Sequence, residues 1–153
     1  AMRERFRHLP PDALFGASPL GVHATVAALT EGGAWLSALH AVLDGNRKLL
    51  STMLAEKLPG VGYHAPEAGY LAWLDVRSLP ISPGERAAAW FQRESRVVLS
   101  AGEDFGEPGR GHVRLNFGTS PDVLTEMVRR LGEAAGRAGV GPSGRAGYPR
   151  STT

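Results

Sequence analysis

The sequence predicts an α+β fold in which a small, mostly antiparallel sheet is packed with helices. In the first half of the chain, apolar residues recur at spacings of three and four, as on a helix with one buried face. The second half contains short strand-like runs separated by turn residues. With 42% apolar and 21% charged residues, the chain is apolar enough for a packed core and too weakly charged for a disordered protein.

The first part of the chain predicts two helix boundaries. Residues 2–8 are typical of the end of a helix, which Pro10 and Pro11 stop, and this start in mid-helix leads us to expect a further part upstream. Ser18 and Pro19 supply the N-cap and the first-turn proline of the next helix. That helix should run to about Thr30 and end at Gly32-Gly33.

A long helix with a single buried stripe follows, from Trp35 to about Leu58. The stripe consists of Trp35, Leu36, Leu39, Val42, Leu43, Leu49, Leu50, Met53 and Leu54. Gly45 lies inside this helix, where it predicts a bend or a close approach by another segment.

Strands are expected at residues 62–65, 70–76, 96–100 and 112–117. Between the second and third, Ser82-Pro83 should start an amphipathic helix whose apolar face contains Ala87, Ala88, Phe91 and, as an open alternative, Trp90. The last helix should run from Ser120 to about Ala138 and bury Leu124, Met127, Val128 and Leu131. Residues 139–153 are rich in glycine, proline, serine and arginine and predict a disordered tail.

Charge and composition argue against several functions. The net charge is +2 and the arginines are scattered among acidic residues, so no nucleic-acid partner is expected, and the patch of Arg3, Arg5 and Arg7 predicts a solvated helix face. The absence of cysteine excludes disulfides, a thiolate nucleophile and cysteine-bound zinc, and fits a cytoplasmic setting. No apolar run is long enough to cross a membrane. The five histidines lack metal-site spacing, so no metal is expected.

The final predicted strand alternates sharply. It places His112, Arg114 and Asn116 on one face, which is either solvated or a site where the planar guanidinium binds a carboxylate with two parallel hydrogen bonds. The preceding glycine-rich segment, residues 100–111, is either a mobile hairpin connection or a backbone that approaches a ligand. Its adjacent Glu103 and Asp104 are interpreted as surface charge.

Four segments in order carry a family resemblance: Gly69-Tyr-Leu-Ala-Trp-Leu-Asp75, Val97-Val-Leu-Ser-Ala-Gly102, Phe105-Gly106 and Val113-Arg-Leu-Asn-Phe-Gly-Thr-Ser120. They resemble the carboxy-terminal portion of class I/II pyridoxal-phosphate-dependent aminotransferases (fold type I), and most closely the cystathionine β-lyase-like branch. Ser18-Pro19, Trp35-Leu36 and Gly45-Asn-Arg47 fit the same order, so the resemblance covers roughly residues 2–137.

The resemblance implies a division of the chain and a set of site residues. Residues 1–34 would be a strip of the large, cofactor-binding domain, residues 35–138 the small domain with its interdomain helix, and residues 139–153 a tail. Arg114 would bind the α-carboxylate of an amino-acid substrate, with Asn116 and Tyr70 beside it. Phe15, Gly16 and Ser18 would lie near the cofactor across a homodimer interface.

The family's cofactor lysine lies in a serine-rich motif upstream, and no such motif is present here. Lys48 and Lys57 are the only lysines, and both lie on the predicted long helix. The resemblance therefore implies that a large domain is missing, that pyridoxal 5'-phosphate is not held covalently by this chain, and that the chain alone is inactive. Aminotransferase, carbon–sulfur β-lyase and a non-catalytic module that binds a carboxylate or dimerises remain open as functions.

Overall fold

The computed structural model describes residue 16 and residues 18–139. The chain forms two compact units, residues 1–40 and 41–153. The predicted helix end at residues 2–8 with its three arginines, and the predicted tail from residue 140 onward, lie outside the described residues.

Helix α2, Pro19–Glu31, begins where the Ser18-Pro19 pair predicts. The carbonyl oxygen of Ser18 accepts a hydrogen bond from the Val22 amide at 3.0 Å, whereas its hydroxyl makes no capping hydrogen bond. The helix ends at Gly32, where a Cβ atom would overlap the carbonyl oxygen of Ala28, so only glycine fits. None of the residues of α2 is buried.

Helix α3, Gly33–Lys57, contributes to the core only through its second half. Asn46, Leu50 and Leu54 are buried, but Trp35 is 69% exposed and Leu36 and Val42 are also exposed. The prediction of a continuous buried stripe is therefore wrong for the first half, because the sheet and its helices cover only the second. No atom lies within 4 Å of a Cβ built on Gly45, so the expected close approach there is wrong as well.

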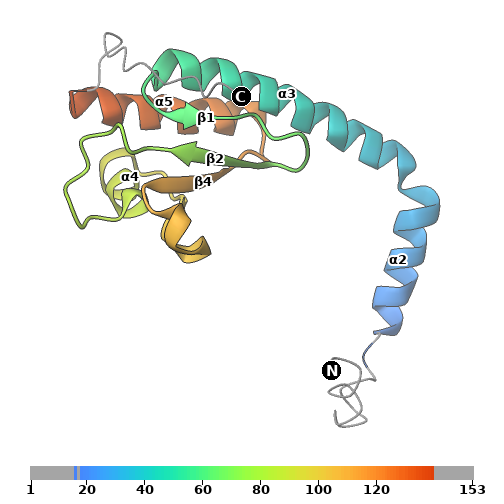
Figure 1. Ribbon diagram of the computed structural model, residues 1–153. Helices are drawn as coiled ribbons and strands as arrows, with labels where there is room; N and C mark the ends of the chain where they lie inside the picture. Colours follow the sequence, from blue (N-terminus) through green and yellow to red (C-terminus); the bar gives the residue numbers. More distant parts are fainter. Residues whose placement is uncertain (1–15, 17, 140–153) are drawn as a thin grey trace, which may run out of the picture. The chain divides into compact units, whose positions relative to one another are not determined.

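The sheet has four strands in the order β1-β2-β4-β3, and all its pairs are antiparallel, which confirms the predicted fold class (Figure 1). The strands are β1 Gly62–Tyr63, β2 Leu71–Asp75, β3 Ser100–Ala101 and β4 His112–Asn116. Of the strand predicted at residues 96–100, only Ser100 pairs. Val97 and Leu99 are buried and Val98 is exposed, so the predicted alternation exists, but no strand lies beside it.

Helices α4, Ala87–Ser95, and α5, Pro121–Arg137, complete the fold. The predicted start of α4 at Ser82-Pro83 is wrong, because Gly84 has a positive φ of 86° in a turn that the Glu85 amide closes onto Ser82 O at 3.0 Å. At α5 the prediction is confirmed. The Ser120 hydroxyl caps the helix by accepting from the Val123 amide at 3.3 Å.

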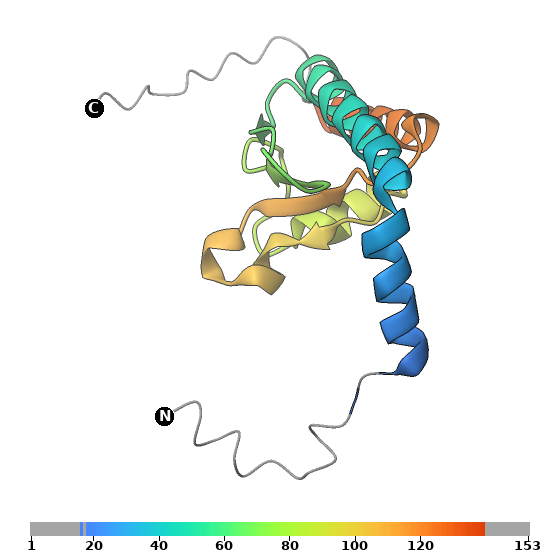
Figure 2. The same cartoon turned by 90° about the vertical axis from the view of Figure 1, so that its right-hand side faces the viewer.

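One face of the sheet carries the core. Alternate residues of β2 and β4 are buried on it, and α4, α5 and the second half of α3 cover it (Figure 2). These strand residues are Ala72, Leu74, Val113 and Leu115. The helices α3 and α5 lie so close that a Cβ on Gly132 would stand 2.9 Å from the Lys57 Cβ. On the opposite face, called the open face below, the strand side chains are exposed or half-buried among the described residues.

No single described helix is long and apolar enough to cross a membrane. Helices α2 and α3 pass that test only when they are counted together across the break at Gly32.

Candidate functional site

The open face of the sheet gathers the polar residues that the alternation predicts. On β4 it presents His112, Arg114 and Asn116, whose register partners on β2 are Asp75, Trp73 and Leu71. On the other side of β4, Ser100 of β3 lies opposite Arg114. Arg114 therefore stands in the middle of this face, between Trp73 and Ser100.

The guanidinium of Arg114 contacts a hydroxyl and an aromatic ring. One of its terminal nitrogens donates to the Ser100 hydroxyl at 3.2 Å, and its Cζ atom lies 4.5 Å from the centre of the Phe105 ring. Among residues 16 and 18–139, no carboxylate lies within ion-pair distance of it. Since a guanidinium has five N–H donors, this half-buried side chain keeps donors for an external anion.

The carboxylate of Asp75 lies on the same face but is already paired. It accepts from the Nε atom of Arg77 at 2.8 Å, and this hydrogen bond lowers its pKa. Asp75 is therefore negatively charged at neutral pH and engaged by Arg77, so it leaves Arg114 available.

Aromatic side chains lie close to Arg114 and contact one another. The Trp73 ring packs edge-on against Phe105 with centroids 5.6 Å apart, and it stacks on His112 at the same distance with an interplanar angle of 20°. The alternation along residues 112–117 predicts that His112 lies on this face. It does not predict that Trp73, Phe105 and Ser100 lie next to Arg114. The parity of β2 would have placed Trp73 with Asp75, but only the strand register brings it opposite Arg114.

Two short 3-10 helices, η2 Gly102–Phe105 and η3 Glu107–Gly109, place Phe105 over Arg114. Gly102 and Gly109 cross so closely that a Cβ on either would overlap the carbonyl oxygen of the other. Gly106 between them has a φ of 111°, which favours glycine. These glycines allow the backbone to approach itself, which neither interpretation of residues 100–111 anticipated.

Of the acidic residues in this loop, Glu103 and Asp104 pair with Arg86. Asp104 is exposed and forms an ion pair with it, as expected for surface charge. Glu103 is only partly exposed, and its Oε2 atom lies 3.9 Å from the Nε atom of Arg86.

Asn116 and Tyr70 meet at the turn that follows β4. The Asn116 Oδ1 atom accepts from the Gly118 amide at 2.8 Å, which fixes the side chain and leaves its NH2 group without a partner among the described residues. The Tyr70 carbonyl accepts from the Phe117 amide at 2.9 Å, and the Tyr70 ring lies against Gly118. Both residues are exposed, and alternation along β4 places Asn116 on the same face as Arg114.

The residues expected near the cofactor belong to the first unit. Phe15 lies outside the described residues, and Gly16 and Ser18 are exposed immediately before α2. Their role stays a prediction.

The two lysines do not fit the holding of an aldehyde cofactor. The Lys48 Nζ atom pairs with Asp44 at 2.6 Å, and that of Lys57 pairs with Glu56 at 2.7 Å. Both belong to α3 and neither lies on the open face of the sheet. Within the described part of the chain, no three His, Cys, Asp or Glu side chains are grouped to hold a metal ion.

Comparison with known proteins finds cystathionine beta-lyases and, at lower identity, aminotransferases. No family model matches the chain. It is 42% identical over 139 residues to a putative cystathionine beta-lyase of Mycobacterium leprae, covering 84% of this chain and 35% of the relative. The similarity to an aspartate aminotransferase of Pyrococcus horikoshii is lower, at 28% over 88 residues, or 58% of this chain and 22% of the relative.

Solved structures agree. A putative PLP-dependent beta-cystathionase from Corynebacterium diphtheriae matches with a TM-score of 0.78 and 34% identity, covering 87% of this chain and 35% of that one. The PLP-bound C-S lyase from Staphylococcus hominis matches with a TM-score of 0.74 and 32% identity, over 77% of this chain and 31% of that one. The chain thus spans about a third of the length of the proteins it matches.

Proposed function

The chain belongs to the cystathionine β-lyase-like branch of the fold-type I pyridoxal-phosphate enzymes, as a carboxy-terminal portion, and we propose on this basis that the complete protein is a carbon–sulfur β-lyase whose substrate carboxylate binds Arg114. The observation that carries the proposal is the guanidinium of Arg114. It is oriented by Ser100 and Phe105 and has no carboxylate partner among the described residues.

The residues around Arg114 would each act on the amino-acid substrate in a simple way. The planar guanidinium pairs with the two carboxylate oxygens and fixes the orientation of the α-carbon. The Asn116 NH2 group is a second donor at the end of the same strand, and the Tyr70 ring limits the space beside it. When bound, pyridoxal phosphate supplies the electron sink of the reaction.

Groups that hold the cofactor would come from outside the described residues. Both lysines are engaged in ion pairs on α3, so this chain supplies carboxylate binding but no amine for the cofactor aldehyde. We therefore expect the chain alone to be inactive. The expectations of a homodimer and of a cytoplasmic setting are kept as part of the proposal.

The lyase is favoured over an aminotransferase by the relatives themselves. The relatives described as cystathionine beta-lyases are 32–44% identical, whereas the aminotransferase relatives are 23–28% identical. One assay distinguishes the two activities by whether a 2-oxo acid is required. A lyase hydrolyses L-cystathionine to a thiol, pyruvate and ammonia without a 2-oxo acid, whereas an aminotransferase requires one as amino acceptor.

The role of Arg114 is tested by Arg114→Lys in the complete enzyme. Lysine keeps the charge but cannot form the two parallel hydrogen bonds, so we expect kcat/KM to fall by the equivalent of about 2–5 kcal/mol, mainly through KM. The matched control is Arg110→Lys, because Arg110 is exposed and pairs only with Glu107 at 3.1 Å among the described residues. An unchanged KM in Arg114→Lys would rule out the proposed role.

A further inference from the structure

Asn46 is a buried amide in the second half of α3, where the other buried side chains are leucines. It is 1% exposed, and its Nδ2 atom donates to two backbone carbonyls, Phe117 O at 2.9 Å and Thr119 O at 2.7 Å. These carbonyls lie 71 and 73 residues further along the chain. One side chain thus joins α3 to the turn between β4 and α5.

Only the NH2 group of Asn46 makes hydrogen bonds among the described residues, and its oxygen does not. Its Oδ1 atom is buried and has no hydrogen-bond partner among the described residues. Leaving a buried acceptor unpaired is costly, whereas an apolar side chain of similar volume would have no such cost. The two donated hydrogen bonds are therefore what the amide provides at this position.

The turn that Asn46 holds also connects two of the candidate substrate residues. Its Phe117 amide donates to Tyr70 O at 2.9 Å, and its Gly118 amide donates to Asn116 Oδ1 at 2.8 Å. Asn46 binds the carbonyl groups of the turn from the core side, while Tyr70 and Asn116 bind its amides. Loosening the carbonyl side would therefore free the Asn116 side chain, two residues from Arg114 on the same strand, and loosen the backbone at Tyr70.

We infer that Asn46 is a positioning residue, which holds the turn at residues 117–119 and thereby sets Asn116, two residues from Arg114 on β4, and Tyr70 at the start of β2 for the substrate. The inference rests on the proposed function for the role of those side chains. Asn46 itself is buried and touches no substrate.

Amide hydrogen exchange of the 153-residue chain tests the local step. Asn46→Asp keeps the shape and removes both N–H donors, and Asn46→Ala serves if a carboxylate facing two carbonyls prevents folding. The control is Leu50→Ala, one turn further along α3, where the side chain is 0% exposed. We expect the Phe117 and Gly118 amides to exchange about tenfold faster, relative to the hydrogen-bonded amides of β4, in the Asn46 variants only. A uniform rise, as expected for Leu50→Ala, would overturn the inference.

Kinetics of the complete enzyme test the second step. We expect the Asn46 variants to raise KM about tenfold with a smaller change in kcat, and Leu50→Ala to leave KM unchanged at a temperature where both are folded. If the turn loosens while KM stays the same, the positioning role is wrong. Failure of the proposed function is separate, because it appears as an unchanged KM in Arg114→Lys and does not alter the exchange result.

Discussion

At the residue scale, the Phe105 ring helps to orient Arg114 by packing against its guanidinium. Its centre lies 4.5 Å from the guanidinium carbon, within the range of a cation–π interaction. Phe105→Leu removes the π face and keeps an apolar side chain, so we expect the free energy of unfolding to fall by about 0.5–1 kcal/mol. Urea denaturation measures the loss. Phe105→Tyr retains the ring and should leave stability nearly unchanged, so equal losses in both variants would contradict this role.

Individual residues differ in how far the sequence predicts them. Alternation along residues 112–117 places Arg114 and Asn116 on the open face, because side-chain direction in a strand depends only on parity. Ser100 and Trp73 could not be assigned as neighbours of Arg114, since their placement depends on strand register. Asn46 was missed because a polar residue within a helix gives no sign of partners 71 residues away.

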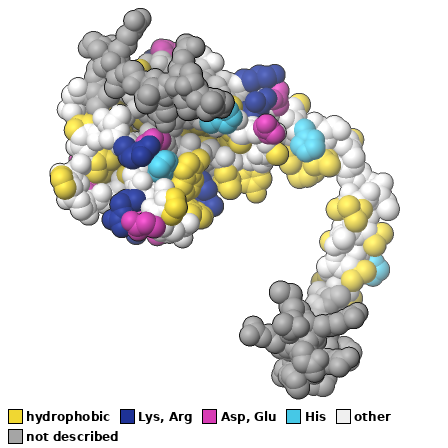
Figure 3. All heavy atoms as spheres, viewed as in Figure 1, with side chains coloured by type: hydrophobic (Ala, Val, Ile, Leu, Met, Phe, Trp, Pro, Cys, Tyr) yellow, Lys and Arg dark blue, Asp and Glu magenta, His cyan; other side chains and the backbone are white. Residues whose placement is uncertain are grey.

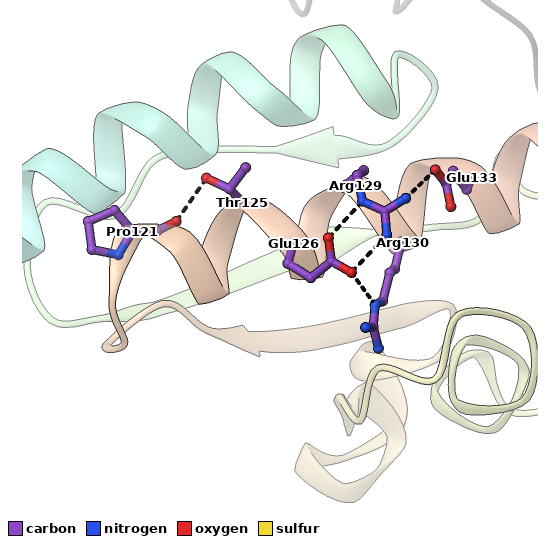
Figure 4. Close-up of polar contacts among 6 residues, drawn as sticks. All are labelled: Pro121, Thr125, Glu126, Arg129, Arg130 and Glu133. Carbon is purple, nitrogen blue, oxygen red and sulfur yellow. Dashed lines mark hydrogen bonds and ion pairs between the residues drawn. The ribbon is translucent and has the colours of Figure 1, made fainter.

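At the scale of single elements, α5 carries an exposed network of charges (Figure 4). Glu126 accepts from Arg129 and Arg130 at 2.7 Å, and these hydrogen bonds lower its pKa from 4.5 to about 2. Because the folded pKa is depressed, the stabilisation is present above pH 4.5 and is lost as the pH falls through about 2.

We therefore expect Glu126→Gln to be less stable than the wild type at neutral pH, with the difference disappearing near pH 2. Urea denaturation across this pH range measures it, and high salt should reduce the difference because the network is exposed. Glu67→Gln is the control, since Glu67 is exposed and has no ion pair in the described part of the chain. A difference that persists undiminished at pH 2 would show that Glu126 acts through something other than its charge.

Two glycines of α5 allow packing to be separated from helix propensity. A Cβ on Gly132 would lie 2.9 Å from the Lys57 Cβ and 3.0 Å from the Lys57 carbonyl oxygen, whereas nothing lies within 4 Å of one on Gly136. Gly136→Ala should stabilise the chain by up to about 1 kcal/mol through propensity alone. Gly132→Ala should instead destabilise it by about 1–3 kcal/mol, because α3 and α5 must separate. Thermal unfolding compares the two, and equal stabilisation would show that the helices yield at no cost.

Elements with strong local signals were predicted and those that depend on partners were not. Ser120 marks the start of α5 correctly because its hydroxyl caps the helix within the same segment. Ser82-Pro83 has the same local signature but forms a turn, since Gly84 takes a positive φ. The alternation at residues 97–99 is real, but a strand also needs a neighbour, and no local pattern reports one.

At the scale of the whole chain, the ordered set of motifs predicted the family better than any single motif did. The small antiparallel sheet and its helices follow from pattern, whereas the family follows from the order of motifs such as those around Trp73 and Arg114. The exposure of the first half of α3 could not be read from its apolar spacing, because spacing identifies a face that seeks burial and does not identify what buries it.

That exposed face predicts self-association of the chain. Apolar side chains lie open along α2 and the first half of α3 (Figure 3), among them Leu20, Leu29 and Trp35 at 80%, 83% and 69% exposure. Surfaces of this kind associate to remove apolar area from water. We expect sedimentation velocity to show a species that grows with protein concentration, and Leu29→Glu to weaken the association by roughly tenfold or more, as burial of one leucine contributes about 1.5–3 kcal/mol.

Val98→Glu, at a residue 77% exposed in the second unit, is the matched control and should leave association unchanged. A chain that stays monomeric at every concentration, or one that both variants affect equally, would exclude α2 as the associating surface.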